Sequence, residues 1–126
     1  MYYIFKNKYD INQPWIKYIH PRKQRIVDQL VKEVPSWVQY IIIFGSATTP
    51  NCREYSDLDI CIIGKAPERI TDLFPCLDRE EKDIIFKDSI EDLRESLKKQ
   101  PFGVVYEIKK RGVIVYEREE NIATAS

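Results

Sequence analysis

Two aspartates, Asp57 and Asp59, stand one residue apart at the start of an apolar run, and ten residues before them Gly45 and Ser46 close an earlier apolar run. Because side chains alternate across a strand, both aspartates are expected to face the same side of a sheet. Two ionised carboxylates a few ångströms apart repel by about 4 kcal/mol at an effective dielectric constant near 20. Solvent, a proton or a cation must therefore reduce this repulsion, and a divalent cation reduces it most strongly.

A magnesium ion suits such a pair, because Mg²⁺ takes oxygen ligands and keeps positions open for water and phosphate. Gly45 and Ser46 fit a phosphate beside it, since a backbone without a β-carbon approaches a ligand closely and free amides and a hydroxyl bind phosphate oxygens. Each motif also has a simpler interpretation. The acids alone could be a solvated strand end, and Gly-Ser alone a helix cap or a tight turn, so only the combination indicates a nucleotide site.

A third acid, Asp83, begins the short apolar run Asp83–Phe86. It stands at the start of its predicted strand as Asp57 does, so all three carboxylates are expected to meet at one end of the sheet. The alternative is a solvated strand cap. Nearby acids that lack a following apolar run in the same phase are assigned to the solvated surface: Asp78, Glu80, Glu81 and Asp88.

Four apolar runs predict the strands that position these acids. In Tyr40–Phe44 the residues that would face each side of a strand are all apolar, which is typical of a central strand covered on both faces. The other three predicted strands are Leu58–Ile63, Asp83–Phe86 and Val113–Tyr116.

Helical spacing of apolar residues predicts a helix over Arg22–Glu33, a second after the N-cap candidate Ser89, and a third that begins near Val104 and ends before Gly112. Residues 67–81 show helical spacing that Pro75 should interrupt. We expect an aromatic N-terminal segment at 1–21, one domain at 22–117 and a frayed tail at 118–126.

Composition limits the function classes. The 126 residues, 44% hydrophobic, suit one core, and 20 basic and 20 acidic residues cancel, so neither nucleic acid nor a membrane is an expected partner. Three cysteines without a CxxC pair (Cys52, Cys61 and Cys76) are expected to be reduced thiols. No signal peptide and no membrane-spanning run is evident, and we expect a soluble, cytoplasmic protein.

The order of strand Ile41–Phe44, Gly45-Ser46, a ten-residue spacer and Asp57-Leu58-Asp59 resembles the nucleotidyltransferase superfamily associated with DNA polymerase β. The short chain is similar to the minimal nucleotidyltransferases, which are often encoded beside a HEPN-domain protein as a toxin and antitoxin pair. The resemblance extends from Arg22 to Glu117 and includes Asp83 as the third acid. It implies an α+β nucleotidyltransferase fold, with a small mixed β-sheet of three to five strands flanked by helices.

The resemblance also implies an activity, namely transfer of AMP from ATP to a hydroxyl of a partner protein, the HEPN toxin. Asp57, Asp59 and Asp83 would be the catalytic and metal-binding residues. One Mg²⁺ would lie among these three, with Asp83 accepting the proton of the attacking hydroxyl, and a second would bind the triphosphate beside Asp57 and Asp59. Gly45 and Ser46 would hold the β- and γ-phosphates.

One departure from the family pattern lies in Ala47–Pro50, where many minimal members carry an arginine. Pro50 should cut any helix from Ser46 to about one turn. Arg53 and Lys87 are the basic candidates to replace that arginine, and each could equally face solvent. The only histidine, His20, is expected at the surface or as a helix cap.

Two other functions stay open at this point. The chain could be an antitoxin that neutralises its toxin by complex formation with idle carboxylates, or an adenylyltransferase acting on an aminoglycoside-type small molecule. The sequence leaves open the nucleotide preference, the acceptor, the number of nucleotides transferred and the oligomeric state.

Overall fold

The computed structural model of this chain describes residues 18–67, 82–99 and 103–118. Expectations for the aromatic N-terminal segment up to residue 17, for the helix around Pro75 and for the tail beyond residue 118 lie outside these residues. None of the helices in the described stretches is both long and apolar enough to cross a membrane.

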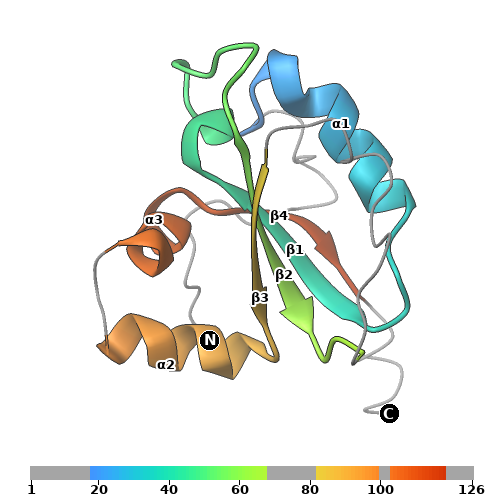
Figure 1. Ribbon diagram of the computed structural model, residues 1–126, viewed down its shortest axis with the longest axis vertical. Coiled ribbons are helices and arrows are strands. Elements are labelled where there is room, and N and C mark those ends of the chain that lie inside the picture. The colour runs from blue at the N-terminus through green and yellow to red at the C-terminus, as the bar shows by residue number, and fades with distance from the viewer. Residues whose placement is uncertain (1–17, 68–81, 100–102, 119–126) are drawn as a thin grey trace.

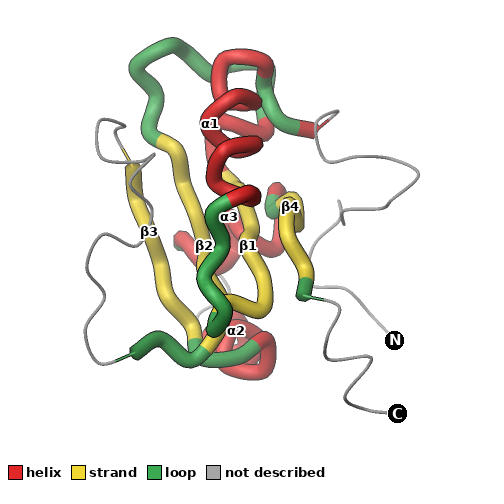
Figure 2. Tube along the Cα trace, turned by 90° about the vertical axis from the view of Figure 1, so that its right-hand side faces the viewer, coloured by secondary structure: helices red, strands yellow, loops and turns green. Residues whose placement is uncertain are grey.

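Four strands form one mixed sheet in the order β3-β2-β1-β4 (Figures 1 and 2). Strand β1 pairs antiparallel with both of its neighbours, whereas β2 and β3 run parallel. The bounds are Val38–Phe44 for β1, Leu58–Gly64 for β2, Lys82–Lys87 for β3 and Val113–Glu117 for β4. The predicted α+β nucleotidyltransferase fold with a small mixed sheet is confirmed.

Strand β1 is buried on both faces, as its run of β-branched residues predicts. Ile41 and Ile43 belong to one hydrophobic cluster, and Ile42 and Phe44 belong to a second cluster on the opposite face. Each fully buried isoleucine contributes about 1.5–3 kcal/mol relative to an exposed one. The strand that leads into Gly45 is therefore held rigidly between two layers.

Helices cover both faces of the sheet. Helix α1 (Pro21–Lys32) lies on one face, and α2 (Ile90–Lys99) and α3 (Val104–Arg111) lie on the other, so that Figure 2 shows α1 in front of the sheet and α2 behind it. The buried stripes that the spacing predicts are Val27 and Leu30 on α1, Leu93 on α2 and Ile108 on α3.

Side-chain caps begin two of these helices. His20 Nδ1 accepts a hydrogen bond of 3.1 Å from the Arg22 backbone N–H at the start of α1, which confirms its expected capping role. Ser89 Oγ accepts a bond of 3.2 Å from the Asp92 backbone N–H before α2, as predicted. A cap of this kind contributes about 1 kcal/mol to helix stability.

Candidate active site

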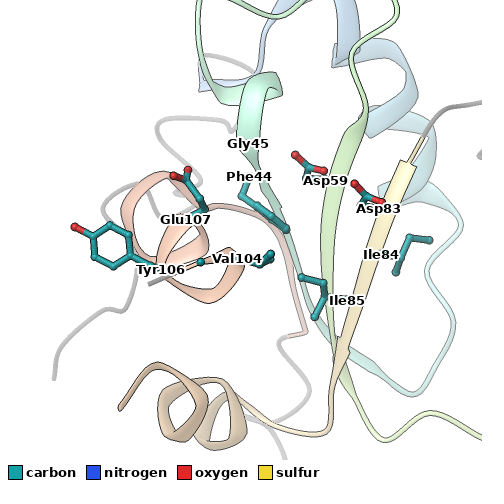
Figure 3. A pocket seen from close by; sticks show the side chains of 10 residues that line it. Phe44, Gly45, Asp59, Asp83, Ile84, Ile85, Val104, Tyr106 and Glu107 are labelled. Atoms are coloured by element: carbon teal, nitrogen blue, oxygen red, sulfur yellow. The ribbon is translucent and has the colours of Figure 1, made fainter. Parts of the chain in front are cut away.

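Strand register brings two of the three predicted acids together. In the parallel pairing of β2 with β3, Asp59 lies directly opposite Asp83, and in the antiparallel pairing of β1 with β2 it lies opposite Phe44. Directly opposed residues on neighbouring strands, about 4.8 Å apart, project to the same face. Figure 3 shows both carboxylates on that face, and a side-chain hydrogen bond joins them.

Asp57 lies at the same end of the sheet, in the exposed position just before β2 begins. Its charge reaches Asp59 and raises the pKa of that carboxyl group, although Asp57 does not line the cavity described below. The three acids are therefore close to one another but do not form a preorganised metal site. Within the described parts of the chain, no three or more His, Cys, Asp or Glu side chains are already arranged to hold a metal ion.

Burial and the neighbouring acids together shift the pKa of Asp59. The pKa of Asp59 rises from 3.8 to about 6, first because the carboxyl group is partly buried and then because of the charges of Asp83 and Asp57. The hydrogen bond to Asp83 and the charge of Glu107 raise it further. Below about pH 6, in the protein without a metal, a proton on Asp59 relieves the repulsion among these acids. A divalent cation would relieve it too, and the all-oxygen donor set fits Mg²⁺.

Gly45 makes a close approach to Asp59 at the end of β1. Its φ of 74° lies in the left-handed region, and a β-carbon at this position would overlap the Oδ2 atom of Asp59. Glycine is the one residue that takes this backbone conformation without strain and leaves the space free. The Gly-Ser motif therefore has a specific structural requirement here, namely room for the second aspartate.

The segment after β1 is a single 3₁₀ turn, η2 (Gly45–Thr48), as the position of Pro50 predicts. Two threonines stabilise it, because Thr48 Oγ1 donates to the Gly45 carbonyl at 2.8 Å and Thr49 Oγ1 donates to the Ser46 carbonyl at 2.9 Å. Ser46 is half-buried in this turn and is not among the residues that line the cavity. The segment Ala47–Pro50 is therefore part of an ordered turn, but it contributes no positive charge.

A cavity of about 790 Å³ opens between the sheet and α3 (Figure 3). Its acidic side holds Asp59, Asp83 and Glu107, and much of the remainder is apolar. The described lining residues are Phe44, Gly45, Asp59, Asp83, Ile84, Ile85, Gly103, Val104, Tyr106 and Glu107. Small-molecule sites commonly measure about 300–1,000 Å³ and combine an apolar wall with a few polar groups.

Sequence reasoning missed the contribution of α3. Glu107 lines the cavity from the helix opposite the sheet, and its carboxylate accepts an ion pair from Arg111, with 3.3 Å between Oε2 and Nε. The spacing of four residues between these opposite charges indicates a pair on one helix face. This spacing could have identified the Glu107–Arg111 ion pair. No pattern in the sequence, however, shows that this face of α3 lies opposite the acids of the sheet.

Neither basic candidate is among the described residues that line the cavity. Lys87 lies at the opposite end of β3 from Asp83, where its Nζ donates to Ser96 Oγ at 2.8 Å. Arg53 is exposed in the spacer, and its backbone N–H donates to Ser56 Oγ at 2.8 Å.

Comparison with known proteins matches most of the chain to one family model. Residues 24–121 match the family model described as "Polymerase beta, Nucleotidyltransferase". No curated protein matches the chain. One similar solved structure is described as "Crystal structure of the toxin-antitoxin with AMP-PNP", with 18% sequence identity, a TM-score of 0.44, and coverage of 81% of this chain and 78% of that one.

Proposed function

Because this chain belongs to the polymerase β nucleotidyltransferase family, we propose that it transfers AMP from ATP to a hydroxyl group, with pyrophosphate as the leaving group. The observation that carries the proposal is the pairing of Asp59 with Asp83 in the wall of a cavity that Gly45 also lines. The cavity volume of about 790 Å³ is in the range that accommodates a nucleotide.

Asp57, Asp59 and Asp83 would hold Mg²⁺, because they supply oxygen ligands at one end of the sheet and repel one another without a cation. When bound, the metal would neutralise charge on the phosphates and lower the pKa of the attacking hydroxyl. Asp59 has to lose its proton before it can act as a ligand, so the proposed site loads more readily above about pH 6.

The other residues act on the nucleotide directly in this proposal. The backbone amide of Gly45 and the hydroxyl of Ser46 bind the phosphate oxygens at the start of η2, the single turn that the hydroxyls of Thr48 and Thr49 stabilise. Phe44, Ile85 and Val104 give the nucleoside an apolar wall and exclude water from the transfer. Asp83, exposed at the edge strand, accepts the proton of the acceptor hydroxyl.

We propose that the acceptor is a hydroxyl of a partner protein and that the chain acts as the antitoxin of a HEPN-domain toxin. The support for this step is the resemblance of Gly45-Ser46 and Asp57-Leu58-Asp59 to the minimal nucleotidyltransferases. In this reading, covalent modification of the toxin is what neutralises it.

The test combines the purified protein with ATP, Mg²⁺ and the product of the adjacent reading frame, and follows pyrophosphate release and the intact mass of that product. The wild type should release pyrophosphate and add the mass of AMP units to the partner. Asp59→Asn and Asp83→Asn should each lower the rate by about 100-fold or more. Asp88→Asn is the matched control, because Asp88 is an exposed acid just beyond β3, and it should retain the wild-type rate. A wild type that releases no pyrophosphate contradicts the proposal.

A neutralisation assay separates catalysis from simple binding. The double variant Asp57→Asn with Asp59→Asn should fail to protect cells from the toxin while still forming a complex with it. Protection that survives the double change favours the binding alternative, and resistance to an aminoglycoside would favour a small-molecule acceptor.

A further inference from the structure

The cavity has an excess of negative charge on the side where a triphosphate would bind. Asp59, Asp83 and Glu107 line it, and Asp57 lies next to it. A triphosphate is itself a polyanion, so a protein cation is expected within its reach. The turn η2 supplies none, because Ala47–Pro50 contains no basic residue.

Arg111 is in the right place to supply this cation. Helix α3 packs against η2 and β1, and it ends at Arg111, two residues before Val113. Val113 pairs with Ile43 of β1, two residues before Gly45. The end of α3 that carries Arg111 therefore lies beside the beginning of the Gly-Ser turn, as the arrangement of α3 and η2 in Figure 1 illustrates.

Glu107 lines the cavity and forms an ion pair with Arg111, which is itself not among the described lining residues but is linked to the cavity through this pair. The ion pair uses Nε at 3.3 Å from Glu107 Oε2, and within the part of the chain that the structure describes Arg111 has no further polar partner. Figure 3 shows Glu107 on α3, on the side of the cavity opposite Asp59 and Asp83. The side chains of Glu107 and Arg111 are 47% and 42% exposed. A pair that is this open to water contributes little to stability and exchanges partners readily.

We propose that Arg111 exchanges its ion pair with Glu107 for the β- and γ-phosphates of the bound triphosphate, and so replaces the arginine missing from the turn after Gly45-Ser46. The inference rests on the proposed function in taking the cavity as a nucleotide site. The planar guanidinium donates two parallel hydrogen bonds to phosphate oxygens, which suits it to this role better than a lysine. The simpler alternative is a cation that only stabilises the C-terminus of α3.

The test measures dissociation constants of the whole protein for ATP and for AMP, each with Mg²⁺, by isothermal titration calorimetry. Arg111→Ala should weaken ATP binding by roughly 10- to 100-fold, the worth of a charge-assisted hydrogen bond. It should change AMP binding by less than about 3-fold, because AMP lacks the β- and γ-phosphates. Arg111→Lys should recover part of the ATP affinity.

Two further variants give the experiment its controls. Lys110→Ala removes an exposed cation from the same last turn and should leave both affinities unchanged. Glu107→Gln removes the competitor for Arg111 together with one negative charge, so it should tighten ATP binding by up to about 5-fold. Circular dichroism of each variant verifies the fold.

The outcomes separate this inference from the function on which it rests. If the wild type binds ATP and Arg111→Ala binds it equally well, or loses ATP and AMP affinity to the same extent, the exchange is refuted and the proposed function stands. Weaker ATP binding by Glu107→Gln also refutes the exchange. If the wild type binds no ATP, both the inference and the proposed function are refuted.

Discussion

Replacing Asp59 by asparagine should make the metal-free protein more stable at neutral pH while removing its activity. Asp59 is a partly buried carboxyl group beside the negative charges of Asp83 and Asp57, and its pKa is raised from 3.8 to about 6. Asparagine has nearly the same shape, carries no charge and can donate a hydrogen bond to Asp83. The variant therefore removes a repulsion and keeps the contact.

The magnitude follows from the shift in pKa. A rise from 3.8 to about 6 corresponds to about 3 kcal/mol at 1.36 kcal/mol per unit. Because Asp59 is only half-buried, solvent screening reduces the expected effect to about 1–2 kcal/mol.

The pH dependence has a definite sign. Because the pKa of Asp59 is higher in the folded than in the unfolded chain, its contribution to stability is fully present below pH 3.8 and is lost as the pH rises through about 6. Wild type and Asp59→Asn should therefore unfold with similar free energies near pH 3.8, whereas the variant should be about 1–2 kcal/mol more stable near pH 8.

Urea unfolding followed by circular dichroism, in the presence of a metal chelator, measures these free energies. The control is Asp88→Asn at an exposed position beyond β3, which should change the free energy of unfolding by less than about 0.5 kcal/mol at either pH. An Asp59→Asn variant that is less stable than the wild type near pH 8 would refute the reasoning, because the carboxylate would then be stabilised by its surroundings.

Two further predictions concern the same site. Addition of Mg²⁺ at about ten times its dissociation constant should stabilise the wild type by about 1.4 kcal/mol, which is measured as a rise in the thermal midpoint. The same addition should leave the stability of Asp59→Asn nearly unchanged. Equal shifts in both proteins would show that the ion binds elsewhere. Gly45→Ala should lower the free energy of unfolding by about 1–2 kcal/mol from backbone strain alone and should also abolish transfer, since its β-carbon displaces the carboxylate of Asp59. A stable, active Gly45→Ala would show that the turn tolerates a β-carbon, and urea unfolding together with the pyrophosphate assay distinguishes these results.

The strands and their acids were predictable because their signals are local. In Ile41–Phe44 both alternating sets of positions are apolar, and the structure buries this strand on both faces. The alternation of Asp57, Leu58 and Asp59 assigns Leu58 to the core and Asp59 to the opposite face, where the structure places them. Periodicity alone carries this information.

The parts that sequence reasoning missed depend on contacts between distant segments. The sequence placed Asp83 at the same end of the sheet as Asp57 and Asp59, but it did not show that Asp83 lies directly opposite Asp59, because local patterns do not encode the register between two strands. Glu107 reaches the cavity only because α3 packs on the sheet beside η2. Lys87 was a candidate for the phosphate-binding cation because it is close to Asp83 in the sequence. It lies at the far end of the same strand, away from the cavity.

The most direct test of the central claim follows the two ends of ATP separately. ATP labelled at the α-phosphate and ATP labelled at the γ-phosphate are each incubated with Mg²⁺, this protein and the adjacent gene product. The α-label should become attached to the acceptor and the γ-label should appear in pyrophosphate, and both should be lost in Asp59→Asn. Transfer of the γ-label to the acceptor, or α-label transfer that persists in Asp59→Asn, would contradict nucleotidyl transfer by these carboxylates.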